Sequence, residues 1–250
     1  MSASSFGALC DGFYVNQKLT TKMELPLRRD GVLEMFERLR KEFPALERFK
    51  RYEEELALES AVRAGSQQWV ALRKTSVRSG AVRPGGADEA SNLHRAVLDL
   101  APMYLSISPL DVESVEALYG FDLEAVGNHN EIVFDALFSK TPLARLVEGT
   151  EWSLVDFQPY LSVGLTQRCD VQASVEIKTR TGSREVRTSR FREEPISVFV
   201  TIRRGGSITD VRELPAIFAG IAEEAERIVT ERVAPLVLAP LREAIASSNA

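Results

Sequence analysis

The sequence predicts a soluble α+β protein, with a ferredoxin-like βαββαβ first part and a larger antiparallel sheet with a long C-terminal helix in the second part. Many short segments alternate apolar and polar residues, as half-buried strands do, whereas a few longer segments repeat apolar residues at helical spacing. Of the 250 residues, 44% are hydrophobic and 27% are charged, which is ordinary for a folded chain. The order of these segments indicates the architecture.

The first part, residues 1–110, begins with an alternating segment at 13–25 that predicts a strand. Asp30 is a suitable N-cap for a helix that ends at Pro44, and Gly and Pro mark a loop before a second helix with a stripe at Leu93, Val97 and Leu100. Three further segments read as strands, at 47–62, 67–82 and 104–110, the first two as a hairpin. The order strand, helix, strand, strand, helix, strand is the ferredoxin-like split βαβ pattern.

The second part, residues 111–250, repeats a mixed pattern. A strand is expected at 112–125, followed by two short helices, and further strands at 151–157, 159–167, 170–181, 185–191 and 195–204. A long helix closes the chain, and Pro235 and Pro240 should kink or break its last turns. This order is also that of helix-grip folds, in which the last helix lies across a curved sheet. No flexible linker separates the two parts, so that one sheet shared by both is equally allowed.

Charge and cysteine content limit the environment of the protein. The formal net charge is −5, which gives no overall attraction to nucleic acid or to an anionic membrane. Cys10 and Cys169 do not form a CxxC pair or a disulfide framework, and the first residues carry no basic segment followed by an apolar run. No stretch approaches the roughly 18 apolar residues of a membrane span. We therefore expect a cytoplasmic protein that does not enter the membrane.

The stretch GNHNE, residues 127–131, holds one of only two histidines. A His-x-Glu pair opens the zinc site of nucleobase deaminases, but that site also needs a PCxxC pair, which this chain lacks. Asn128 is instead a good N-cap, and Glu131 stands three residues later, where it can complete a capping box. We interpret GNHNE as the start of a helix; a histidine that contacts a ligand or a partner is the alternative.

Other catalytic signals are weak. His94 lies beside the apolar stripe of the second helix, where a solvated or locally bonded role is the simplest interpretation. A triad of Cys169 with His94 or His129 depends on geometry that the sequence does not give. The chain has no GxSxG elbow, phosphate-binding glycine loop or HExxH motif, so we expect no metal and no cofactor.

A group of arginines is the feature that most favours binding. Arg190 and Arg192 would share one face of a strand with Thr188, and a neighbouring strand would add Arg203. Such a face would suit an acidic partner, phosphate groups or a neighbouring subunit. The alternative is a solvated face on which nearby glutamates balance the charge. The predicted binding residues are Arg184, Arg187, Arg190, Arg192, Arg203 and Arg204.

Three stretches carry a resemblance to known sequences: the segment from Ile107 to Phe138, then DFQPYLSVGL, then EEPISVFVTIRR. Over residues 104–204 the chain resembles uncharacterised bacterial proteins of about this length, to which no activity is assigned. The resemblance implies a shared fold and assigns no catalytic residue.

These observations favour a non-enzymatic protein-interaction or assembly protein, a homo-oligomer or one with a protein partner, because strand edges and an amphipathic final helix offer docking surfaces. A second hypothesis is a small-molecule-binding protein or enzyme, with a cavity between the second-half sheet and residues 210–246, lined by Phe157, Tyr160, Phe199 and Phe218. A third is nucleic-acid binding through the arginine face, although the aromatic signature of an RRM is missing.

Overall fold

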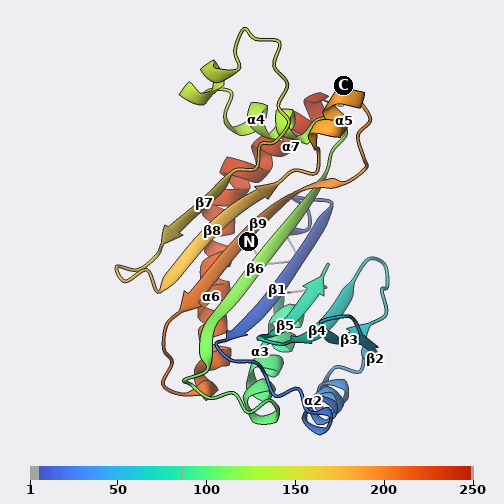
Figure 1. Cartoon of the computed structure of the whole chain (residues 1–250), viewed down its shortest axis with the longest axis vertical. Coiled ribbons are helices and arrows are strands. Elements are labelled where there is room, and N and C mark those ends of the chain that lie inside the picture. Colours follow the sequence, from blue (N-terminus) through green and yellow to red (C-terminus); the bar gives the residue numbers. More distant parts are fainter. Residues whose placement is uncertain (1–5, 86, 249–250) are drawn as a thin grey trace.

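One nine-stranded antiparallel sheet runs through the computed structural model, which describes residues 6–85 and 87–248 (Figure 1). Residues 1–5, part of the N-terminal stretch considered above for a leader, lie outside that description. The strand order is β2-β3-β4-β5-β1-β6-β9-β8-β7. The strands are β1 (Gly12–Thr21), β2 (Leu46–Arg51), β3 (Leu56–Ser60), β4 (Gln67–Arg73), β5 (Ser76–Val82), β6 (Val112–Glu124), β7 (Tyr160–Gly164), β8 (Val171–Lys178) and β9 (Pro195–Gly205). Both parts of the chain therefore contribute to the same sheet, and they meet where β1 pairs with β6.

Burial alternates along the central strands and gives the sheet two different faces. On β6, Val115, Ala117, Tyr119 and Phe121 are buried, whereas their neighbours Glu116 and Leu118 are only half-buried. The buried set faces the helices, and we call this face the helix side. Figure 1 shows α3 (Ala87–Tyr104) and α6 (Leu214–Ile228) behind the sheet. The opposite face, which we call the open side, carries polar and aromatic side chains of intermediate exposure.

The helices bury one continuous apolar core against the sheet. Helix α2 (Arg29–Glu42) contacts α3, and α3 contacts α6, which in turn packs against β6 and β9. Phe218 of α6 and Leu93 of α3 are fully buried at this interface. Burial of such large side chains is the main source of stability in a domain of this size. The predicted large antiparallel sheet with a long C-terminal helix is confirmed.

The C-terminal helix continues past its prolines. Helix α6 passes directly into a π-helical segment, η3 (Val229–Leu238), and then into α7 (Ala239–Ser248). Pro235 lies inside the π-helical segment. Proline lacks an N–H group, and its ring crowds the preceding turn of a helix. The wider π-helical turns accommodate both effects without ending the helix. The expected break at Pro235 is therefore replaced by a change of helical type.

The ferredoxin-like order of the first part is not confirmed. Each of the two long predicted strands folds as a hairpin: residues 47–62 contain β2 and β3, and residues 67–82 contain β4 and β5. Four strands instead of two thus separate α2 from α3, and β1 pairs antiparallel with both β5 and β6. A split βαβ unit needs a parallel neighbour for its first strand. The acidic run at Glu53–Glu55 turns the chain, with Tyr52 N–H donating to the Glu55 carbonyl at 2.8 Å.

Other predicted strands also differ. Residues 104–110 form the end of α3 and a turn, and residues 151–157 contain no strand. Residues 183–188 form the short helix α5 (Ser183–Thr188), where the Glu185 carboxylate accepts from Gly182 N–H at 3.0 Å. That contact fixes the first turn of α5, so the apparent alternation at 185–191 is misleading. Helix α4 (His129–Leu137) and the 3-10 turns η1 (Pro142–Leu146) and η2 (Val211–Glu213) complete the chain. Within the described ranges, every helix is too short or too polar to cross a bilayer.

Candidate functional site

The GNHNE stretch starts α4, as predicted. The Asn128 side-chain oxygen accepts from Asn130 N–H at 3.1 Å, which is an N-cap bond, and its amide nitrogen donates to the Leu154 carbonyl at 2.9 Å. Asn130 is fully buried. Its side-chain oxygen accepts from Phe157 N–H at 2.9 Å and from Thr179 Oγ1 at 2.7 Å, and its nitrogen donates to the Thr181 carbonyl at 3.0 Å. The stretch therefore joins α4 to two segments that are distant in the sequence.

His129 has a structural role in the same place. Its ring is buried, with Nε2 3.2 Å from the Ala125 carbonyl, and Nδ1 accepts from Arg180 N–H at 3.4 Å. Burial lowers the pKa of His129. A neutral ring that donates from Nε2 and accepts at Nδ1 matches both neighbours. Both nitrogens are thus used within the fold.

The other reactive groups do not meet. His94 is completely buried beneath the sheet, with Nδ1 2.8 Å from Ser79 Oγ and its ring against Phe218, and burial lowers its pKa to about 3. Cys169 is exposed in the β7–β8 turn. Cys10 is half-buried, and burial together with Asp11 and Asp122 raises its pKa to about 11. His94, His129 and Cys169 contact three separate sets of residues, so the structure forms no triad from them. Among the described residues, no three His, Cys, Asp or Glu side chains are grouped to hold a metal.

The predicted arginine face is divided between two places. Arg184 and Arg187 lie on α5, and Arg190 and Arg192 follow in the loop to β9, so none of the four is on a strand. Arg203 lies eight residues beyond Pro195 on β9, which at about 3.3 Å per residue places it roughly 26 Å along the strand. The assumption of a strand at 185–191 caused this error. Secondary structure alone brings Arg203 and the α5 arginines to opposite ends of β9.

Each arginine group has its own surroundings. Arg184, Arg190 and Arg192 line a hollow of about 300 Å³ beside α5, together with Glu185 and Thr188. Arg192 pairs with Glu185 at 3.5 Å there. At the other end of β9, Arg203 pairs with Glu113 at 3.3 Å and with Glu116 at 3.5 Å, and Arg204 pairs with Asp170 at 3.1 Å. Arg203 and Arg204 are therefore committed to ion pairs within the fold.

The aromatic residues expected around a cavity are also separated. Phe218 is buried on the helix side, whereas Phe199 lies on the open side, 6.4 Å from the Tyr14 ring. Phe157 packs edge-on against Phe134 and Phe138, with ring centroids 5.2 and 4.9 Å away. Tyr160 lies on the exposed strand β7. These four rings do not line one cavity.

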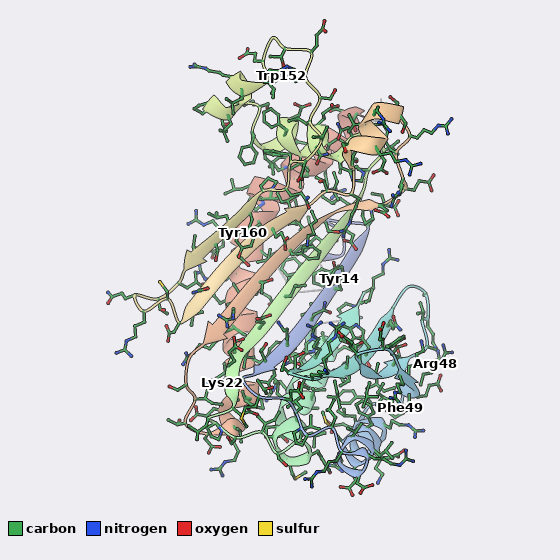
Figure 2. All side chains as sticks on the ribbon, in the orientation of Figure 1. Tyr14, Lys22, Arg48, Phe49, Trp152 and Tyr160 are labelled. Carbon is green, nitrogen blue, oxygen red and sulfur yellow. The ribbon has the colours of Figure 1, made fainter. Side chains whose placement is uncertain are left out.

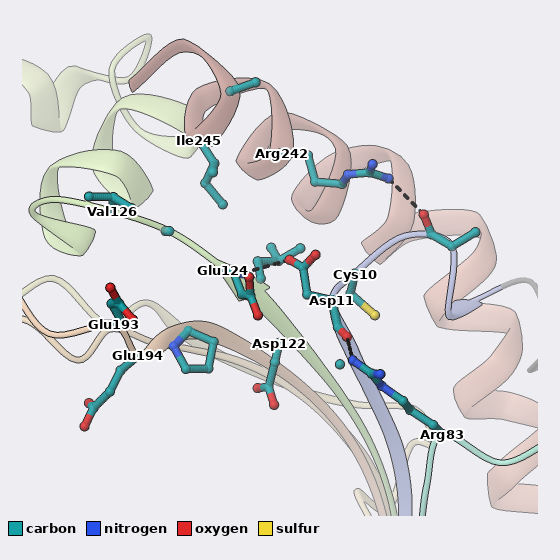
Figure 3. A pocket seen from close by; sticks show the side chains of 16 residues that line it. Cys10, Asp11, Arg83, Asp122, Glu124, Val126, Glu193, Glu194, Arg242 and Ile245 are labelled. Atoms are coloured by element: carbon teal, nitrogen blue, oxygen red, sulfur yellow. Dashed lines mark hydrogen bonds between the residues drawn. The ribbon is translucent and has the colours of Figure 1, made fainter. Parts of the chain in front are cut away.

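A groove lies instead where the central strands end beside the C-terminal helix α7 (Figure 3). Its volume is about 950 Å³, and its lining includes Asp122, Glu124, Arg83 and Arg242. Asp122 accepts from Ser197 Oγ at 2.6 Å, and Arg242 donates to the Ala8 carbonyl at 3.0 Å. The groove is polar, and its residues come from five distant segments. No local sequence pattern identified it.

Exposed apolar side chains gather in one segment of the chain. Seven of the fifteen exposed large hydrophobic side chains among the described residues lie between positions 143 and 163, which we call the apolar segment. The seven are between 45% and 73% exposed: Leu143, Leu146, Trp152, Val155, Tyr160, Leu161 and Val163. Figure 2 shows Trp152 on the lobe that follows α4 and Tyr160 on β7 at the margin of the sheet. The seven side chains are therefore close in sequence and are divided between the lobe and β7.

The two edges of the sheet differ in charge. Edge strand β2 has the sequence LERFKR, in which Glu47, Arg48, Lys50 and Arg51 are exposed, and its ladder with β3 is irregular near Leu46. Charges and irregularities of this kind protect an edge from pairing. Edge strand β7 has the sequence YLSVG, which carries no charge, and all five residues are exposed. Of the two edge strands, only β2 carries the charges and the irregular ladder that oppose pairing with another strand.

Comparison with known proteins adds no assignment. No protein-family model matches the chain, and no curated protein matches it.

Proposed function

We propose that this is a cytoplasmic, non-enzymatic interaction or assembly protein of bacterial type that docks through the apolar segment. The observation that carries the proposal is the concentration of seven exposed apolar side chains within residues 143–163. Monomeric proteins rarely expose large contiguous apolar patches, and such patches mark sites of association. Aromatic side chains such as Trp152 and Tyr160 are the usual energetic anchors of protein interfaces.

The surroundings of the segment support this proposal. The lobe is tied to the fold by the buried bonds of Asn128 and Asn130 to Leu154 and Phe157. A docking surface held in place by its backbone loses less conformational entropy on binding than a free loop. The candidate catalytic groups His94 and His129 make hydrogen bonds within the fold instead.

Light scattering after size exclusion tests the proposal over a wide concentration series. We expect the wild-type protein to self-associate or to bind a second protein, and the double variant Tyr160→Ser with Leu161→Ser to lose that association. The matched control is Met103→Ser with Leu110→Ser, which removes two apolar side chains outside the segment that are at least as exposed. A wild type that stays monomeric at every concentration and retains no protein partner from its own host would refute the proposal.

The groove in Figure 3 favours a second candidate, a protein that binds a small polar ligand. Its carboxylates and the guanidinium groups of Arg83 and Arg242 offer donors and acceptors in one place. Native mass spectrometry of the protein from its own host tests this function. A defined small mass that is retained by the wild type and lost in Arg242→Ala would support it, and the absence of any retained mass would count against it. An acidic or phosphate-bearing ligand at Arg184, Arg187 and Arg190 stays a prediction.

A further inference from the structure

The free edge of β7 presents its main-chain groups outward at alternate residues. Leu165 N–H donates to the Val171 carbonyl at 2.8 Å, and Ile177 N–H donates to the Pro159 carbonyl at 2.9 Å. In an antiparallel ladder the residues that bond one neighbour alternate with those that face away. The odd-numbered residues of β7 therefore bond β8, and the N–H and C=O groups of Tyr160, Ser162 and Gly164 point away from the sheet.

The strand contains nothing that opposes pairing at this edge. A proline blocks an edge only where its missing N–H faces outward, and Pro159 occupies an inward position. No charged side chain occurs between Pro159 and Leu165. In Figure 1 β7 is the outermost strand of its half of the sheet. The outward N–H and C=O groups of Tyr160, Ser162 and Gly164 are therefore free of the barriers found on β2.

We propose that two copies of this chain pair through β7, antiparallel, about a two-fold axis at Ser162. The inference rests on the proposed function and deepens it by naming the partner and the register. Outward-facing residues must oppose each other, and the register that matches all five residues sets Ser162 against Ser162 of the second copy. Tyr160 then lies opposite Gly164 of the second copy, and Gly164 lies opposite Tyr160 of the second copy. Three bonded pairs of this kind exchange about six main-chain hydrogen bonds and make one continuous sheet.

The side chains on the helix side fit this register. Leu161 of one copy comes opposite Val163 of the other, in the close, non-bonded type of pair. Both side chains are apolar and exposed, and of their partners on β8, Val175 opposite Leu161 is half-buried and Ala173 opposite Val163 is buried. The pairing therefore extends the apolar layer beneath the sheet from one copy into the next.

The open side and the flanks are complementary as well. Gly164 has no side chain, and the Cys169 sulfur lies over it, 2.7 Å from the position of a Cβ. The ring of Tyr160 from the second copy would reach this sulfur, and contacts between sulfur and an aromatic ring are favourable. Asp156 precedes β7 and Arg168 follows it. In an antiparallel pair the segment before β7 of one copy lies beside the segment after β7 of the other. Asp156 of one copy therefore approaches Arg168 of the other.

Disulfide formation tests the register directly. In a Cys169→Ser background, Ser162→Cys places two thiols on the two-fold axis with Cα atoms about 5.5 Å apart, within disulfide reach. Mild oxidation should give a covalent dimer in most of the protein. The matched control Tyr160→Cys lies on the same strand and face, but its two Cα atoms would be roughly 14 Å apart, because four residues of offset separate them. Control and test variants that cross-link equally would overturn the register.

Light scattering separates this inference from the proposed function. Ser162→Lys sets two ammonium groups against each other at the axis and should shift the dimer midpoint at least tenfold toward monomer. Ser174→Lys makes the same change one strand inward on the same face and should leave the midpoint unchanged. A wild-type oligomer that Ser162→Lys leaves intact, with no cross-link at position 162, overturns β7 pairing while the assembly function stands. A strict wild-type monomer overturns both.

Discussion

The ring of Tyr14 on β1 covers Gly120, the residue directly opposite on β6, so closely that a Cβ at position 120 would overlap the ring. The same ring lies 6.4 Å from Phe199 on β9. Three central strands are thus joined on the open side by two aromatic rings and a glycine. A glycine in a strand lowers intrinsic strand stability, and an aromatic ring across it restores packing.

Gly120→Ala should destabilise the protein by about 2–4 kcal/mol, because the Tyr14 ring has to leave its position and the sheet cannot widen locally. Urea unfolding followed by circular dichroism measures the change. Gly220→Ala is the control, since nothing lies within 4 Å of a Cβ on that exposed turn of α6. There, alanine should stabilise by about 0.5–1 kcal/mol through its helix propensity. Equal effects at the two positions would contradict the packing argument.

Asn130→Ala should cost about 3 kcal/mol of unfolding free energy. It removes three hydrogen bonds and leaves Phe157 N–H, Thr179 Oγ1 and the Thr181 carbonyl without their partner in a buried site. Chemical denaturation is the measurement. Asn128→Ala should cost about 1 kcal/mol as a lost N-cap. The predicted capping box is not formed, because the Asn128 side chain accepts from Asn130 N–H and the exposed Glu131 side chain makes no bond to Asn128. Glu131→Ala should therefore change stability by less than about 0.5 kcal/mol, and a larger loss would contradict this.

Stability should fall as pH decreases from neutral toward acid because of His94. Its folded pKa of about 3 lies below the ordinary value of 6.5, so the ring is neutral in both states above pH 6.5. Below pH 6.5 the unfolded chain binds a proton that the folded protein does not, and stability decreases by up to about 1.4 kcal/mol per pH unit. Between pH 7.5 and pH 5.0 this is about 2 kcal/mol, with a further part from His129, whose pKa burial also lowers.

Urea unfolding of wild type and His94→Leu at both pH values isolates that contribution. The variant should be less stable at pH 7.5, since Ser79 Oγ loses a hydrogen-bond partner, yet it should lose about 2 kcal/mol less than the wild type on acidification. Parallel pH profiles for the two proteins would show that His94 is protonated in the folded state.

Glu116 stabilises the open side by bridging two cations. Lys18 Nζ and Arg203 Nε each lie 3.5 Å from its carboxylate, which is mostly shielded from solvent. Glu116→Gln should destabilise by about 1 kcal/mol at low salt and by less at high salt, because the cations then face each other unneutralised. Glu113→Gln removes a more exposed partner of Arg203 and should have almost no effect. Thermal unfolding at two salt concentrations distinguishes these outcomes.

Local patterns predicted the elements whose burial is regular. The alternation along β6 and β9 and the stripe at Phe218 and Ile221 follow from one buried face each, and the structure matches them closely. The hairpin turns within residues 47–62 and 67–82 were missed because neither contains Gly, Pro, Asn or Asp, the residues that usually mark a turn. Alternation of apolar and polar residues over a segment as short as α5 is compatible with either a strand or a helical turn. The bond from Gly182 N–H to the Glu185 carboxylate favours the helical turn.

The candidate docking surface was less predictable, because it depends on position in the sheet. YLSVG reads the same whether the strand is central or at an edge, and only the order of pairing places β7 outermost. The arginine group illustrates the converse. Six arginines in one part of the sequence suggested one face, yet β9 carries Arg203 and Arg204 away to partners on β6 and in the β7–β8 turn.

The order of the elements, with α6 after every strand of the sheet, has a consequence for synthesis. The strands β1, β6 and β9 leave the ribosome before residues 214–248, which supply the helical cover for β6 and β9. At translation rates of about 5–20 residues per second, the apolar side of β6 and β9 stays bare for several seconds. A nascent chain in this state is prone to aggregation, so chaperones that shield apolar surface should bind it until α6 and α7 have been synthesised.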